Sequence, residues 1–103
     1  MRIVSDGPSA PIFRIEYAYG KRLILLNSDH NFYEYVYEIA AESKYFHPLI
    51  DLLFYAFADV RDQLGDEKYN FVFDEIMKRF SNRYGALLNT KEVAEILTTL
   101  KEF

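Results

Sequence analysis

The sequence predicts an α+β domain in which an N-terminal two-stranded antiparallel hairpin precedes a bundle of about four helices. Two strand-like runs meet at a glycine within the first 27 residues, and beyond them apolar residues recur at helical spacing. The chain has 103 residues, half of them hydrophobic, and no cysteine. One core of this size is therefore feasible, and it must be held by packing rather than by disulfides or thiolate-bound zinc.

Residues 1–10 show little apolar periodicity and contain Gly7 and Pro8. Such a segment is typical of a flexible arm or of a linker from a larger protein. We therefore expect residues 11–103 to form a single domain.

The two strand-like runs are IFRIEYAYG and KRLILLN, and they meet at Gly20, where a tight hairpin turn demands positive φ. Phe13, Ile15 and Tyr17 share one face of the first run, which predicts a half-buried strand. The continuous apolar run 23–26 predicts a second strand covered on both faces. Because an isolated two-stranded hairpin is marginal in water, helices or further strands must complete it.

The first helix is expected to begin at capping oxygens in residues 27–29 and to run to about Ser43. Its outer face carries Glu34, Glu38 and Glu42 at intervals of four. An acidic stripe of this kind is typical of a solvated helix face, and a cation site would need a second group of oxygen ligands beside it.

Pro48 suits the first turn of the second helix and Gly65 its end. The intervening LIDLLFYAFADV is apolar almost all round, which predicts the central helix of the core. The third helix is expected from Glu67 to Arg83, closed by Gly85, with a basic cluster near its end where cations favour the helix dipole. That cluster is Lys78, Arg79 and Arg83.

The fourth helix is predicted by Asn89 and Glu92, which have the spacing of a capping box. Its apolar stripe would be Val93, Ile96, Leu97, Leu100 and Phe103.

Charge and composition restrict the classes of partner. Sixteen acidic and twelve basic residues give a formal charge of −4, so phosphate backbones would be repelled on average and we expect no nucleic-acid partner. No apolar run approaches the roughly 20 residues that span a bilayer, and the N-terminus does not resemble a secretory signal. The absence of cysteine fits a reducing compartment, and we expect a cytoplasmic protein without a membrane partner.

Residue patterns for catalysis are missing, and we expect neither a catalytic residue nor a cofactor. The four glycines lie too far apart for a phosphate-binding loop, and no nucleophile-elbow pattern surrounds any serine. The alternative is a small metal-dependent hydrolase. Asp29 with His30, and His47 with Asp51 four residues apart, form a four-ligand candidate set. Asp29 and His30 also have a simpler role as helix-start groups, and His47 has one as the residue that precedes a proline in an extended turn.

Aromatic residues are the most informative excess. Nine Tyr and nine Phe are many for this length, and the tyrosines cannot all point into one core. Tyrosine is enriched at protein interfaces because it combines a large rigid surface with a polar tip. The alternative is that these side chains ring an ordinary core. The hypothesis is a non-enzymatic interaction domain that self-associates or docks on a larger protein, with interface candidates Tyr17, Tyr19, Tyr33, Tyr35, Tyr37 and Tyr45.

The segment LILLNSDHNFYEYVY and the long apolar segment that follows resemble the carboxyl-terminal region of bacterial and phage ATP-binding proteins of the GHKL type (gyrase, histidine kinase and heat-shock chaperone). Asn27, His30, Phe32 and Tyr33 match a strand-to-helix junction of that family, whereas Asn31 stands where the family often has proline. The likeness covers about residues 12–88. It implies an accessory domain that docks on or transmits changes from an ATPase domain, and none of the family's nucleotide-binding residues carries over.

Overall fold

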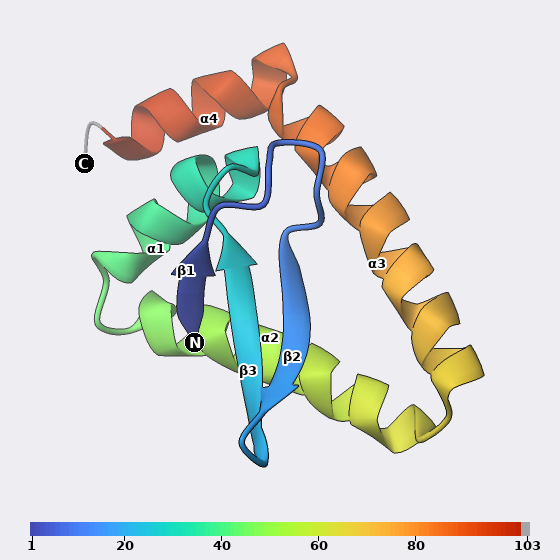
Figure 1. Cartoon of the computed structure of the whole chain (residues 1–103). Coiled ribbons are helices and arrows are strands. Elements are labelled where there is room, and N and C mark those ends of the chain that lie inside the picture. The colour runs from blue at the N-terminus through green and yellow to red at the C-terminus, as the bar shows by residue number, and fades with distance from the viewer. Residues whose placement is uncertain (102–103) are drawn as a thin grey trace.

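The computed structural model describes residues 1–101, and over this range three strands form one mixed sheet (Figure 1). The strands are β1 (Arg2–Val4), β2 (Phe13–Ala18) and β3 (Lys21–Asn27), in the order β1-β3-β2. The α+β class is confirmed, but the simple two-stranded hairpin is wrong. Residues 2–4, which we assigned to an arm, pair in parallel with β3 because the second edge of that strand would otherwise leave its backbone groups unpaired.

The predicted hairpin itself is present between β2 and β3. Ala18 pairs with Lys21, and the two turn residues both have positive φ, 54° at Tyr19 and 71° at Gly20. Two left-handed residues in a two-residue loop match the twist of the flanking strands. The Tyr19 side chain, 101% exposed, projects from this tip.

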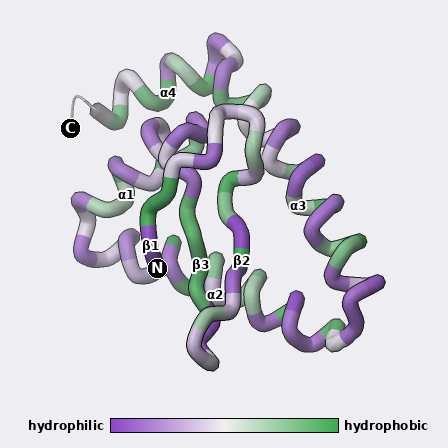
Figure 2. Tube along the Cα trace, viewed as in Figure 1, coloured by the Kyte–Doolittle hydropathy of each residue, from purple (hydrophilic) through white to green (hydrophobic). Residues whose placement is uncertain are grey.

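Strand β3 lies in the centre of the sheet and is the most apolar strand. Ile24, Leu25 and Leu26 are buried, and Figure 2 shows β3 as a hydrophobic stretch between its neighbours. Since successive side chains point to opposite faces, burial of all three means that both faces are covered here, as the apolar run predicted.

The helical part comprises a π-helical turn η1 (Tyr33–Tyr37), α1 (Glu38–Ala41), α2 (Phe46–Leu64), α3 (Glu67–Leu88) and α4 (Lys91–Lys101). In Figure 1, α2 runs behind the sheet, α3 passes along the β2 side, and α4 lies across one end. The first predicted helix is therefore a π-turn followed by one short α-helix. Such π-turns are rare and change the direction of the side chains that follow.

The expected capping residues 27–29 have a different task. Asn27, Ser28 and Asp29 bond mainly to the N-terminal segment: the Ser28 hydroxyl donates to the Val4 carbonyl, for example, over 3.0 Å. The backbone N–H of Phe32 instead donates a hydrogen bond to Nδ1 of the His30 ring. The side chains of residues 27–29 are equally suited to cap a helix or to bind a neighbouring loop. Because β1 pairs with β3, the loop after β1 lies within reach of these side chains.

The predicted end of α2 is confirmed, since Gly65 terminates it with φ 65°. Its predicted position at the centre of the core is wrong. Only Phe54 and Ala58 of α2 are buried. A helix that is apolar all round is predicted to be buried on every side. In this chain the sheet and α3 bury α2 on one side only.

Helix α3 continues past Gly85 to Leu88, so the predicted stop at Gly85 is wrong. The missing side chain makes room for the neighbouring segment, because a Cβ at Gly85 would lie 3.1 Å from the His30 ring and 3.2 Å from Asn31. The basic cluster at 78–83 consequently lies inside the helix and not at its end.

Asn89 ends α3 and does not form the expected capping box of α4. Its side-chain oxygen accepts a hydrogen bond from Asn31 at 3.2 Å. Phe103, the last residue of the predicted apolar stripe, lies outside the described residues.

The core joins the sheet to α2 and α3 through the buried residues Ile12, Phe13, Ile24, Leu26, Phe32, Tyr37, Phe54, Ala58, Met77 and Leu88. Among residues 1–101, no helix has both the length and the apolar character needed to cross a bilayer.

Candidate functional site

His30 is a structural residue at the junction of β3 and the helices. It is buried, its Nε2 lies 2.9 Å from the carbonyl oxygen of Ser81, and its Nδ1 accepts the backbone N–H of Phe32 at 3.0 Å. An acceptor at Nδ1 requires the proton to sit on Nε2, which then donates to Ser81. Both ring nitrogens are therefore engaged, and no lone pair remains for a metal.

Asp29 follows β3 and binds the loop that follows β1. Its carboxylate accepts hydrogen bonds from the Ser5 hydroxyl and, at 2.8 Å, from the backbone N–H of Gly7. These two donors, Ser5 foremost, hold the pKa of Asp29 below its usual value because they stabilise the charged form. The side chain secures the loop and points to no partner on the helices.

His47 and Asp51 do meet, together with Tyr37. The Tyr37 hydroxyl lies 3.0 Å from Asp51 Oδ1 and 3.2 Å from His47 Nε2, and that nitrogen lies 3.3 Å from Asp51 Oδ2. Burial, followed by the hydrogen bond to Asp51 and its negative charge, raises the pKa of Tyr37 to about 12. These three side chains, the Tyr37 triad, link η1 to the first two turns of α2.

This pKa predicts a loss of stability at alkaline pH. In the unfolded chain a tyrosine ionises near pH 10, whereas folded Tyr37 keeps its proton to about pH 12. Between these values only the unfolded state loses the proton, so the free energy of unfolding falls as pH rises. Urea unfolding across this window, read by circular dichroism, should show a shallower pH slope in Tyr37→Phe. Parallel slopes in the two proteins would contradict the assignment.

The four candidate metal ligands are thus not assembled into one site. Only His47 and Asp51 are paired, while Asp29 and His30 belong to other hydrogen-bond networks. Across residues 1–101, no group of three or more His, Asp or Glu side chains is arranged to hold a metal ion.

Three of the six candidate interface tyrosines are exposed, and the other three are covered wholly or in part. Tyr17, Tyr19 and Tyr45 are exposed, Tyr33 and Tyr35 are partly buried against the core, and Tyr37 is buried. Tyr17 is also bound within the chain, because its hydroxyl donates to Asp62 of α2. The tyrosines therefore do not form one continuous surface.

The larger exposed apolar surface lies on α2 and α3. On α2 the exposed fractions are 63% for Phe46, 61% for Leu49, 50% for Leu53 and 47% for Val60. On α3 the exposed apolar side chains are Tyr69, Phe71, Val72, Ile76, Phe80 and Leu87. Sequence reasoning missed this surface because it assigned the apolar residues of α2 to the core. The signal was present, since an all-round apolar helix exceeds what a small domain can cover.

Charged residues of α2 are all bonded within the chain. Asp59 and Asp62 bind Arg22 of β3 at 2.8 and 2.7 Å, Arg61 binds Asp74 of α3 at 2.9 Å, and Asp51 belongs to the Tyr37 triad. Asp51 and Arg61 are half-buried at the edge of the packed side, whereas Asp59 and Asp62 are exposed and both bond to Arg22. The stripe formed by Phe46, Leu49, Leu53, Ala56 and Val60 carries no charge.

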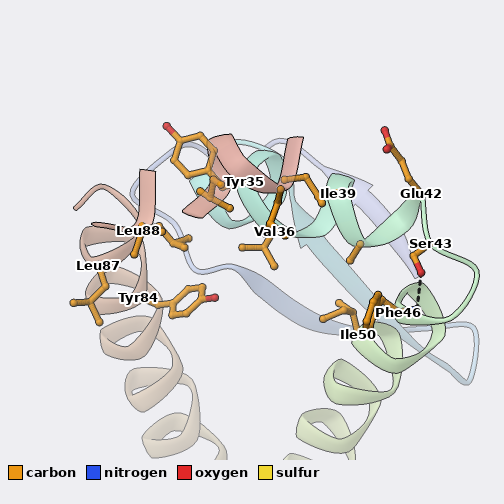
Figure 3. Close-up of a pocket in the computed structure, with 14 residues that line it drawn as sticks. Tyr35, Val36, Ile39, Glu42, Ser43, Phe46, Ile50, Tyr84, Leu87 and Leu88 are labelled. Atoms are coloured by element: carbon orange, nitrogen blue, oxygen red, sulfur yellow. Dashed lines mark hydrogen bonds between the residues drawn. The ribbon is translucent and has the colours of Figure 1, made fainter. Parts of the chain in front are cut away.

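A cavity of about 780 Å³ lies where α1, the start of α2, the end of α3 and α4 approach one another. Figure 3 shows Phe46 and Ile50 on one wall and Tyr84, Leu87 and Leu88 on the other. Among the described residues that line it, Glu42 is the one that carries a charge. A ligand pocket usually offers a few converging polar groups, whereas this cavity is an apolar space that joins the exposed faces of α2 and α3.

No family model, curated protein or solved structure matches this chain.

Proposed function

We propose that this chain is a non-catalytic protein-interaction domain whose binding surface is the exposed apolar face of α2 and α3. The observation that carries the proposal is the exposure of Phe46, Leu49, Leu53 and Val60 along one helix while every charge of that helix is bonded within the chain. Contiguous apolar surface of this kind marks a contact site with another macromolecule.

The size of the molecule supports the same reading. The chain exposes 7280 Å², whereas a compact monomer of 12.2 kDa exposes about 6,100 Å². Its radius of gyration is 14.6 Å, against about 13 Å for a compact domain of this length. A partner that covers the helices would remove this excess.

The resemblance to the carboxyl-terminal region of GHKL-type proteins supports a larger ATP-binding protein as the setting in which the domain acts. In that setting the domain docks on an ATPase domain or transmits conformational changes from it. Its own residues take no part in catalysis or nucleotide binding.

Site-specific photo-crosslinking tests the proposal. A photoreactive phenylalanine analogue placed at Leu53, in the chain expressed in its native cell, should form covalent adducts with another polypeptide. The same analogue at the exposed Glu38 on α1 provides the control and should form far fewer. Equal adduct yields at the two positions, or none at Leu53, would mean that this face is not an interaction surface.

A further inference from the structure

The exposed apolar residues of α2 follow the spacing of a coiled-coil seam. Phe46, Leu49, Leu53, Ala56 and Val60, which we call the α2 seam, are separated by alternating steps of three and four residues, and all five are exposed. This spacing places them in one narrow stripe along the helix, as the core positions of a coiled coil are placed. A stripe of this form is suited to packing against another helix.

The seam is complementary to itself when a second copy of α2 runs antiparallel to the first. A two-fold axis between residues 54 and 55 places Leu53 opposite Ala56 of the second copy, and Leu49 opposite Val60 of the second copy. Each of the two leucines then meets a smaller side chain, as close packing of facing helices requires, and Phe46 faces Gln63 at the end of the pair. The same reversal places Asp59 opposite Ile50 of the second copy, so no acid faces an acid across the pair.

The excess exposed area of the whole chain is comparable to the area that an obligate homodimer buries. The excess over a compact monomer is about 1,200 Å² per chain, or about 2,400 Å² for two chains. Obligate homodimers bury about 2,000 Å² or more in total and have apolar interfaces, whereas transient complexes bury less and are more polar. The cavity at the start of α2 lets the exposed face of α3 contribute, since Phe46 and Leu87 both line it.

We propose that the partner on the α2 seam is a second copy of this chain, bound as a two-fold symmetric dimer with antiparallel α2 helices at its centre. This inference rests on the proposed function, because it names the occupant of the same surface.

Sedimentation velocity over a concentration series tests the dimer. The wild-type chain should sediment at twice its 12.2 kDa mass. Leu53→Lys places two cations beside the two-fold axis and should weaken association by about 100-fold or more, as substitutions at the centre of an interface do. Tyr55→Lys adds the same charge to the same helix off the seam and should leave association unchanged. Circular dichroism of both variants establishes that they remain folded.

Disulfide crosslinking tests the antiparallel register. The chain has no cysteine, so single variants Leu49→Cys and Val60→Cys, which face each other away from the two-fold axis, each carry one thiol. After the two variants are mixed and allowed to exchange subunits, mild oxidation should crosslink the mixture and neither variant alone. Crosslinking of Leu49→Cys with itself would indicate parallel helices and overturn the proposed arrangement, because antiparallel packing holds the two Leu49 positions far from the two-fold axis and from each other.

The two proposals fail in different ways. A monomer at all concentrations, or a dimer that Leu53→Lys leaves intact, overturns the inference. If the photo-crosslink at Leu53 then joins a polypeptide of another mass, the proposed function stands with a different occupant. If Leu53 forms no adduct of any mass, both proposals fall.

Discussion

Phe54→Ala is expected to lower the free energy of unfolding by about 3–5 kcal/mol, as truncation of a buried phenylalanine does. Phe54 is 3% exposed and its ring meets two others edge-on, with centroids 5.1 Å from Phe13 and 5.7 Å from Phe32. It therefore joins α2 to the sheet and to the start of the helical segment. Removing the ring leaves a cavity at the place where three parts of the fold meet.

Urea unfolding measures this effect. It is best carried out in the Leu53→Lys background, so that the proposed association of chains does not add to the apparent stability. Tyr55→Ala, one residue away on the exposed side of the helix, is the matched control and should change the free energy by about 0.5 kcal/mol or less. A loss below about 1 kcal/mol for Phe54→Ala would mean that α2 does not pack on the sheet as described.

Asn27→Ala is expected to destabilise the chain by about 3 kcal/mol, because it leaves several partly buried backbone groups without partners. The amide oxygen of Asn27 accepts the backbone N–H groups of Asp6 at 3.1 Å and Asp29 at 3.0 Å. Its amide nitrogen donates to the carbonyl oxygens of Gly7 at 2.8 Å and Pro11 at 3.3 Å. The side chain is 1% exposed, so water cannot replace these bonds.

A second substitution separates the contribution of these hydrogen bonds to stability from the contribution of side-chain packing. Asn27→Asp keeps the shape and the acceptor oxygen but faces a carboxylate toward two carbonyl oxygens. Its instability should diminish at acid pH, where the protonated carboxyl group again donates a hydrogen bond. Hydrogen exchange of residues 5–11 should accelerate in both variants, whereas Asn82→Ala on the exposed side of α3 should change neither property. Unchanged exchange in residues 5–11 would refute the role of Asn27 as their anchor.

Local signals in the sequence determined the elements that depend on neighbours along the chain. The hairpin followed from alternation and Gly20, and the end of α2 followed from Gly65, because positive φ at a glycine is a property of the backbone itself. The apolar run of β3 likewise indicated burial on both faces. The α+β class follows from these features alone.

Only the tertiary structure decided the features that depend on distant segments. Strand β1 has three residues and pairs with a strand more than 20 residues away, so its own sequence carries little signal. Gly85 reads as a helix stop, yet it lies within α3 because the His30 ring needs the space. His30 reads as a metal ligand, yet two backbone groups occupy its nitrogens.

The exposed apolar face of α2 shows the same division. The sequence of α2 determines how apolar each residue is, and it indicates a helix that is apolar almost all round. Which residues are covered depends on how many layers the chain can place around the helix, and a chain of 103 residues with one sheet covers only Phe54, Ala58 and their neighbours. Hydropathy is a property of each residue, whereas burial is a property of the whole arrangement.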